Sequence, residues 1–94
     1  MPESPDTPRG IPKNVFGEQV MRWGTKDAAA RERIKNLTRA ELVAGGVTAR
    51  MAREWAEFYE NEVIRIPRNP SARGRAELMR HAQQLLESQD EQDI

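Results

Sequence analysis

The stretch from Leu37 to Tyr59 constrains the fold of this chain more than any other part of the sequence. It reads LTRAELVAGGVTARMAREWAEFY. Thr38 and Glu41 have the spacing of a capping box, and Thr48 offers a second helix cap after two consecutive glycines. The pattern therefore predicts a short helix, a tight corner and a longer second helix.

The second of these helices is predicted over 49–65, where Pro67 stops it. Its apolar residues recur at the spacing of one buried face. They are Met51, Trp55, Phe58, Tyr59 and Val63. Exposed rings could instead form a stacking platform for bases or a ligand, but helical spacing favours a core role for these residues and for Trp23.

Two earlier helices carry weaker signals. Asn14 is the expected cap of a helix over 15–23, in which Gly17 costs about 1 kcal/mol relative to alanine. Thr25 is the expected cap of the next helix, over 26–36, with Asp27 in its positive first turn. A last helix begins after Asn69 and Pro70 or near Gly74, and its apolar face is Leu78, Met79, Ala82, Leu85 and Leu86.

Length and composition limit the architecture to one small domain. The chain has 94 residues, no cysteine, and fifteen basic residues balanced by fifteen acidic ones. Disulfides, thiol nucleophiles and cysteine-ligated zinc are therefore excluded, and no global field attracts nucleic acid or a membrane. We predict an all-α fold: a compact orthogonal bundle of four to five short helices, including a helix-turn-helix-like corner.

The ends differ from the middle in composition. Four prolines in 1–12 predict a flexible arm, 13–87 form the helical domain, and the acidic segment 88–94 is expected to be a disordered tail. The start of the chain has no ordinary signal peptide and no run is long enough to span a membrane. We expect a cytoplasmic protein, or one exported without an ordinary signal.

The glycine corner invites comparison with a DNA-binding helix-turn-helix. In that reading Arg50, Arg53 and Glu54 would face the groove of a duplex. Glu41 and Gly45 oppose the comparison, because they stand where the first helix usually contributes apolar packing. A purely structural corner is the alternative, and we favour it.

Arginines gather around the last corner. Between Ile64 and Arg80, only Glu77 opposes five arginines, which are Arg65, Arg68, Arg73, Arg75 and Arg80. Together with the N-terminus of the last helix, they could hold a phosphate or carboxylate. The alternative is a solvated surface in which these arginines pair with acids of the preceding helix, namely Glu54, Glu57, Glu60 and Glu62.

Catalysis is not favoured by the residues present. His81 is the only histidine and flanks an apolar stripe, and a domain of this size has little volume for a cleft that holds a base and a nucleophile. We expect no catalytic residues, no metal and no cofactor.

Three segments resemble a small uncharacterised all-helical domain of proteobacterial proteins, including the C-terminal ends of polymorphic toxins and secreted effectors. They are NVFGEQVMRWGTKDAAARERI, LTRAELVAGGVTARMAREWAEFYENE and NPSARGRAELM. The resemblance implies a context rather than a mechanism. It implies an effector-associated module whose partner is an immunity protein, a carrier or a second copy.

Two functions remain open from the sequence. The first, which we favour, is a non-catalytic protein-interaction or adaptor domain, and it predicts no affinity for nucleic acid. The second is a small nucleic-acid or anion-binding domain that uses the corner, the arginines or both. The second predicts binding that weakens steeply as salt rises.

Overall fold

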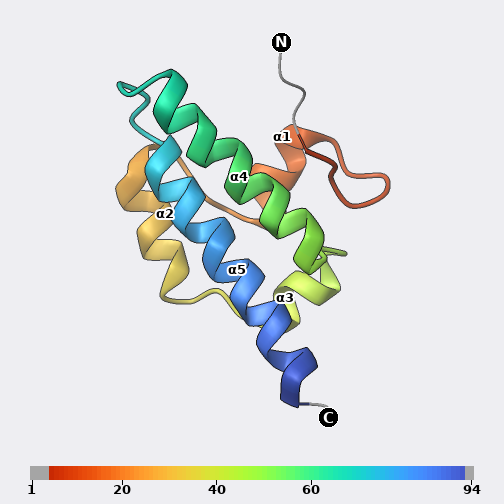
Figure 1. Ribbon diagram of the computed structural model, residues 1–94. Coiled ribbons are helices and arrows are strands. Elements are labelled where there is room, and N and C mark those ends of the chain that lie inside the picture. Colours follow the sequence, from red (N-terminus) through yellow and green to blue (C-terminus); the bar gives the residue numbers. More distant parts are fainter. Residues whose placement is uncertain (1–4, 93–94) are drawn as a thin grey trace.

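The computed structural model describes residues 5–92, with side chains described through Glu87. No β-strand occurs in this part of the chain, so the predicted all-α fold is confirmed. In Figure 1, α5 lies between α2 and α4. The helices are α1 (Lys13–Val15), the π-helix η1 (Phe16–Val20), α2 (Lys26–Ile34), α3 (Arg39–Ala44), α4 (Ala49–Arg65) and α5 (Ala72–Gln92). None of these helices combines the length and apolar character that crossing a bilayer requires.

The corner between α3 and α4 forms as the sequence predicts. Thr38 accepts a hydrogen bond from the Glu41 N–H, and the Glu41 carboxylate accepts one from the Thr38 N–H, which completes the capping box. Gly46 takes a φ of +81°, a left-handed value that closes the helix. Thr48 then caps α4 through the Met51 N–H.

The first helix differs from its prediction. It begins at Lys13 with Pro12 at the cap position, so Asn14 lies inside α1 and is not its cap. The chain then widens into η1, where the Met21 N–H bonds to the Phe16 carbonyl over 2.9 Å. Within η1, Gly17 packs tightly against Trp23, since a Cβ there would lie 2.7 Å from three atoms of the indole. Gly17 therefore permits a close ring contact and is not merely a weak helix former.

The start of α2 is also capped differently from the prediction. Thr25 occupies the cap position, but its side chain makes no capping hydrogen bond. The Lys26 N–H instead donates to Ser71 Oγ at 2.7 Å, and the Asp27 N–H donates to the Pro70 carbonyl at 2.8 Å. The turn that precedes α5 thus caps α2, and α2 ends at Ile34, two residues before its predicted end.

The core lies where α5 meets its two neighbours and where α4 meets the N-terminal segment. Trp55 and Tyr59 are buried as predicted, whereas Met51, Phe58 and Val63 are half-buried. The largest fully buried side chains are Phe16, Met21, Leu42, Leu78 and Met79.

Both end segments contain helix or side-chain contacts within the described residues. Within the predicted arm, Pro8 is buried and lies next to Gly46 of the corner, and the Asp6 carbonyl accepts a hydrogen bond from the Trp55 indole at 2.9 Å. At the other end α5 continues to Gln92, five residues beyond the predicted limit of the domain. Residues 1–4 and 93–94 of the predicted arm and tail lie outside the described residues.

Candidate functional site

A cleft of about 710 Å³ opens between the N-terminal helices and α4. We call it the aromatic cleft. One wall comes from α1 and η1, the rim comes from the loop that leads to α2, and α4 and α5 complete it. Its lining residues are Lys13, Asn14, Gly17, Glu18, Arg22, Trp23, Gly24, Thr25, Trp55, Phe58, Tyr59 and Arg75.

Four rings form the apolar side of the aromatic cleft. Trp23 stands edge-on to Tyr59, with 5.3 Å between ring centroids, and Trp55 lies 5.7 Å from both Trp23 and Phe58. Three of these rings are buried and Phe58 is half-buried. The rings therefore serve the core, as predicted, while some of their atoms also line the cleft.

Arg75 reaches the cleft from α5. Its guanidinium lies 4.9 Å from the centroid of the Trp23 ring and donates a 2.9 Å hydrogen bond to the Gly24 carbonyl. A longer contact of 3.4 Å joins it to the Tyr59 hydroxyl. Burial raises the pKa of the Tyr59 phenol, and the hydrogen bond and charge of Arg75 oppose this to a smaller extent. The phenol is therefore neutral at physiological pH and the arginine supplies the charge.

Three residues in the loop on the rim and at the start of α2 lie in the left-handed region of backbone space. Arg22 has a φ of 51° and Lys26 a φ of 68°, values that are uncommon outside glycine, and Gly24 has a φ of 64°. In Arg22 and Lys26 this conformation costs energy, so the surrounding structure must hold it in place. Such strained residues cluster at functional sites. Here Arg75 and Ser71 provide part of that support.

Polar groups on the rim are left without a capping role. Asn14 lies inside a helix, and the Thr25 side chain makes no capping hydrogen bond to α2. Asn14 and Thr25 both line the cleft, and their side chains, an amide and a hydroxyl, can donate and accept hydrogen bonds. Three cations, Lys13, Arg22 and Arg75, line the cleft against the single carboxylate of Glu18, although Arg22 also pairs with Glu41 outside it, at 2.7 Å.

The predicted arginine cluster is not one site. Arg75 lies in the aromatic cleft, whereas Arg73 and Arg80 line a different hollow. Arg65 pairs with Glu62 at 2.9 Å, and Arg80 pairs with Glu60 at 2.8 Å, as the solvated-surface alternative anticipates. Arg68 and Arg73 are exposed, and no ion pair to either occurs within the residues whose side chains are described.

The N-terminus of α5, where the sequence suggested a bound anion, already holds a carboxylate of the chain itself. Asp27 Oδ1 accepts the Gly74 N–H at 2.8 Å. An external anion that used the Gly74 N–H would have to displace Asp27. One of the donors on which the predicted anion site depends is therefore already bonded within the chain.

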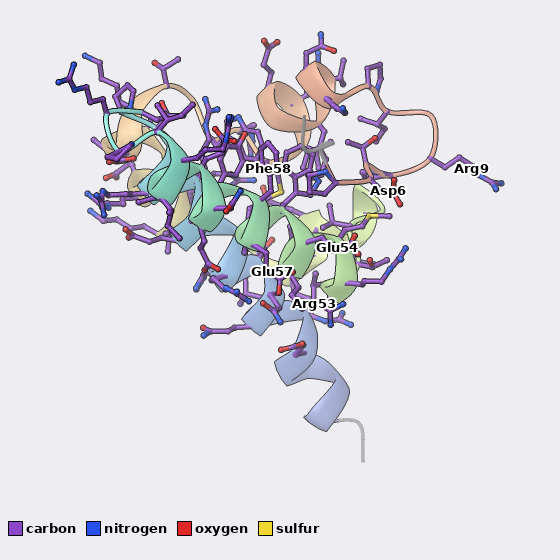
Figure 2. All side chains as sticks on the ribbon, turned by 45° about the horizontal axis from the view of Figure 1, so that its top comes forward. Asp6, Arg9, Arg53, Glu54, Glu57 and Phe58 are labelled. Carbon is purple, nitrogen blue, oxygen red and sulfur yellow. The ribbon has the colours of Figure 1, made fainter. Side chains whose placement is uncertain are left out.

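The outer face of α4 carries both signs of charge. Arg50 and Arg53 are exposed, as the helix-turn-helix comparison requires. Figure 2 shows Arg53 beside Glu54 and Glu57 on the same helix, while Arg9 projects from the loop before α1. Among the described side chains, no group of three or more His, Asp or Glu residues is arranged to hold a metal ion.

The aromatic cleft was not predicted from the sequence, although helix geometry alone indicates that the arginine cluster is divided between two faces of α5. Arg73 and Arg75 are two residues apart on a helix, hence about 200° apart around its axis, and so could not share one site. The role of Lys13, Asn14 and Thr25 had no such signal, because it depends on how distant segments pack.

Comparison with known proteins places the chain in a family whose role is not assigned. The family model described as "Domain of unknown function (DUF4951)" matches residues 1–86. A solved structure, described as the NMR structure of the protein from Acinetobacter baumannii, is 36% identical with a TM-score of 0.75. The similarity covers 90% of this chain and 82% of that one. Among curated proteins, none matches the chain.

Proposed function

We propose that this chain, which belongs to the family of the domain of unknown function DUF4951, is a protein-interaction module. Its aromatic cleft would receive a short segment of a partner protein, an apolar side chain flanked by acidic residues. The observation that carries the proposal is a cleft of about 710 Å³ that combines an aromatic wall with three cations and one carboxylate.

The chemistry of the rim suits a peptide. An extended peptide brings one N–H donor and one carbonyl acceptor per residue. The Asn14 amide can satisfy both, and the Thr25 hydroxyl can do the same. Phe58, which is half-buried, offers apolar surface to the peptide side chain. Lys13 is exposed at the rim, where a charge chiefly selects the partner and speeds association.

A peptide-display selection against the whole protein tests the proposal. We expect enrichment of peptides with an aromatic or aliphatic residue between acidic ones. A selected peptide should change tryptophan fluorescence on binding, since Trp23 and Trp55 line the cleft. Enrichment of basic peptides, or of none, would contradict the proposal.

Charge reversal at the rim gives a matched pair of variants. Lys13→Glu should lower the affinity for the selected peptide by about tenfold or more, because an attraction between lysine and the acidic peptide is replaced by a repulsion. Lys35→Glu changes an exposed lysine that does not line the cleft, and should leave affinity nearly unchanged. Equal losses in both variants would point to non-specific charge attraction.

The effector resemblance supplies the partner classes to test first, an immunity protein or a carrier. Either would present the acidic segment to the cleft.

Nucleic-acid binding is the second candidate. It is favoured by Arg68 and Arg73, which are exposed and lack ion pairs within the described side chains. It is opposed by Glu54 and Glu57, which lie next to Arg53 on the face that would meet a duplex (Figure 2). A phosphate backbone would meet repulsion there.

A further inference from the structure

A second hollow of about 680 Å³ lies along α5, between α2 and α4. We call it the α5 groove. It is separate from the aromatic cleft and shares no lining residue with it. Its apolar lining consists of Ile34, Val63 and Ala76. Its polar lining consists of Arg31, Glu60, Arg73, Glu77, Arg80, His81 and Gln84.

Both carboxylates of the α5 groove are occupied by arginines. Arg31 donates to the two oxygens of Glu77 at 3.2 and 2.8 Å. Arg80 donates to the two oxygens of Glu60, both at 2.8 Å. The hydrogen bond from Arg80 holds the pKa of Glu60 below its ordinary value, which keeps this pair ionised. Neither acid is therefore left to repel an incoming anion.

Outside these pairs, the groove is lined by one further cation, Arg73, and by the imidazole of His81. Arg73 is exposed and has no ion pair within the described side chains, and His81 is half-buried. They are eight residues apart on α5, so about 12 Å of helix separates them. Ala76 and the two neutralised pairs lie between them along the groove.

We propose that the α5 groove binds an organic phosphate ester. The phosphate is held by Arg73, whose planar guanidinium matches phosphate oxygens through paired hydrogen bonds. The apolar body of the ester lies on Ile34, Val63 and Ala76, and His81 meets a polar group at its far end. Inorganic phosphate lacks that body and binds less tightly.

NMR titration of the isotope-labelled whole protein tests this site, with phenyl phosphate, inorganic phosphate and benzyl alcohol as probes. Phenyl phosphate should shift the Arg73 side-chain N–H and the backbone amides of Val63 and Ala76, saturating at about 1 mM. Inorganic phosphate should bind at least about fivefold more weakly, and benzyl alcohol should not saturate. Equal affinity for the two phosphates, or no saturable shift, would overturn the proposal.

Two matched arginine variants separate this site from general anion attraction. Arg73→Gln should lower the affinity for phenyl phosphate by about tenfold, the effect of losing a charge-assisted hydrogen bond. Arg68→Gln changes an exposed arginine outside the groove and should leave affinity unchanged. Both changes are at exposed positions, so both variants should fold. Equal losses would overturn the site and favour a diffuse phosphate-binding surface, the nucleic-acid candidate.

Discussion

Asp27 and Gly74 join the N-termini of two helices that run parallel, because the Asp27 carboxylate accepts the Gly74 N–H at 2.8 Å. In return, the Asp27 N–H donates to the Pro70 carbonyl in the turn before α5. Each helix thus caps the other. The backbones of the two helices approach so closely that a Cβ on Gly74 would lie 2.6 Å from the Asp27 Cα.

Gly74→Ala should therefore destabilise the domain, although alanine is the better helix former. The new methyl group meets backbone atoms, which cannot turn away, so α2 and α5 must separate and the mutual capping weakens. We expect a loss of about 2 kcal/mol in the free energy of unfolding, measured by urea denaturation.

Gly45→Ala is the matched control. Gly45 has a φ of −81°, and its Cβ would lie 2.8 Å from a methyl group of the half-buried Val20 side chain, while the nearest backbone atom, the Glu41 carbonyl oxygen, would be 3.4 Å away. Gly45→Ala should lower the free energy of unfolding clearly less than Gly74→Ala does. A Gly74→Ala protein as stable as Gly45→Ala would show that the two helix ends tolerate separation.

Gly17→Ala should also be destabilising, opposite in sign to the expectation from helix propensity. The methyl group would overlap the Trp23 indole, a ring fixed by packing on Phe16 and Tyr59. We expect a cost of about 1–3 kcal/mol and a changed near-UV circular dichroism signal from the tryptophans. A gain in stability without a spectral change would contradict the described packing.

The helix caps illustrate how much of the fold can be predicted from the sequence. Caps at Thr38 and Thr48 were predictable because each bonds to a residue three positions later. The cap of α2 was not, since Ser71 lies 45 residues away from Lys26. Local chemistry thus identified the corner, while tertiary packing decided the rest.

The candidate site was predictable to a lesser extent. Trp23 and Trp55 were correctly expected in the core, but the cleft they line depends on how η1 meets α4. The buried Arg33 was missed for the same reason: it donates to the Met21 carbonyl at 2.9 Å, a partner on another segment. Charged residues at helical spacing give no sign of such burial.

Acid should weaken the domain partly through Glu41. Its pKa is held below the ordinary value, first by the hydrogen bond from the Thr38 N–H and then by Arg33. A lowered folded-state pKa stabilises the fold above the unfolded value of about 4.3, and that contribution is lost as pH falls through the folded-state pKa. Stability should therefore decline below about pH 5.

Glu41→Gln should flatten this acid decline, measured as urea midpoints across acidic pH. Glu32→Gln is the control, because Glu32 is exposed and pairs only with exposed Lys35. It should leave the slope almost unchanged. Identical slopes for the Glu41 variant and the unmodified protein would remove Glu41 as a source of acid sensitivity.

The nucleic-acid candidate makes a salt-dependent prediction. Fluorescence anisotropy of labelled duplex and single-stranded DNA and RNA should be measured at about 50 and 200 mM salt. If Arg68 and Arg73 contact phosphates, affinity falls with salt, and Arg68→Ala or Arg73→Ala reduces both affinity and salt slope. No binding at the lower salt would remove this candidate and leave the protein-interaction proposal.

Trp55→Phe should loosen the N-terminal segment while keeping an aromatic ring in the core. The change removes the indole N–H that donates to the Asp6 carbonyl at 2.9 Å, a loss of about 1 kcal/mol. The Ile11 N–H, which bonds to the Pro8 carbonyl, should then exchange with solvent faster than global unfolding explains. Trp23→Phe is the control, because it alters ring packing without touching the hydrogen bond to Asp6. Faster Ile11 exchange in both variants alike would mean that core packing, rather than this hydrogen bond, holds the segment against α4.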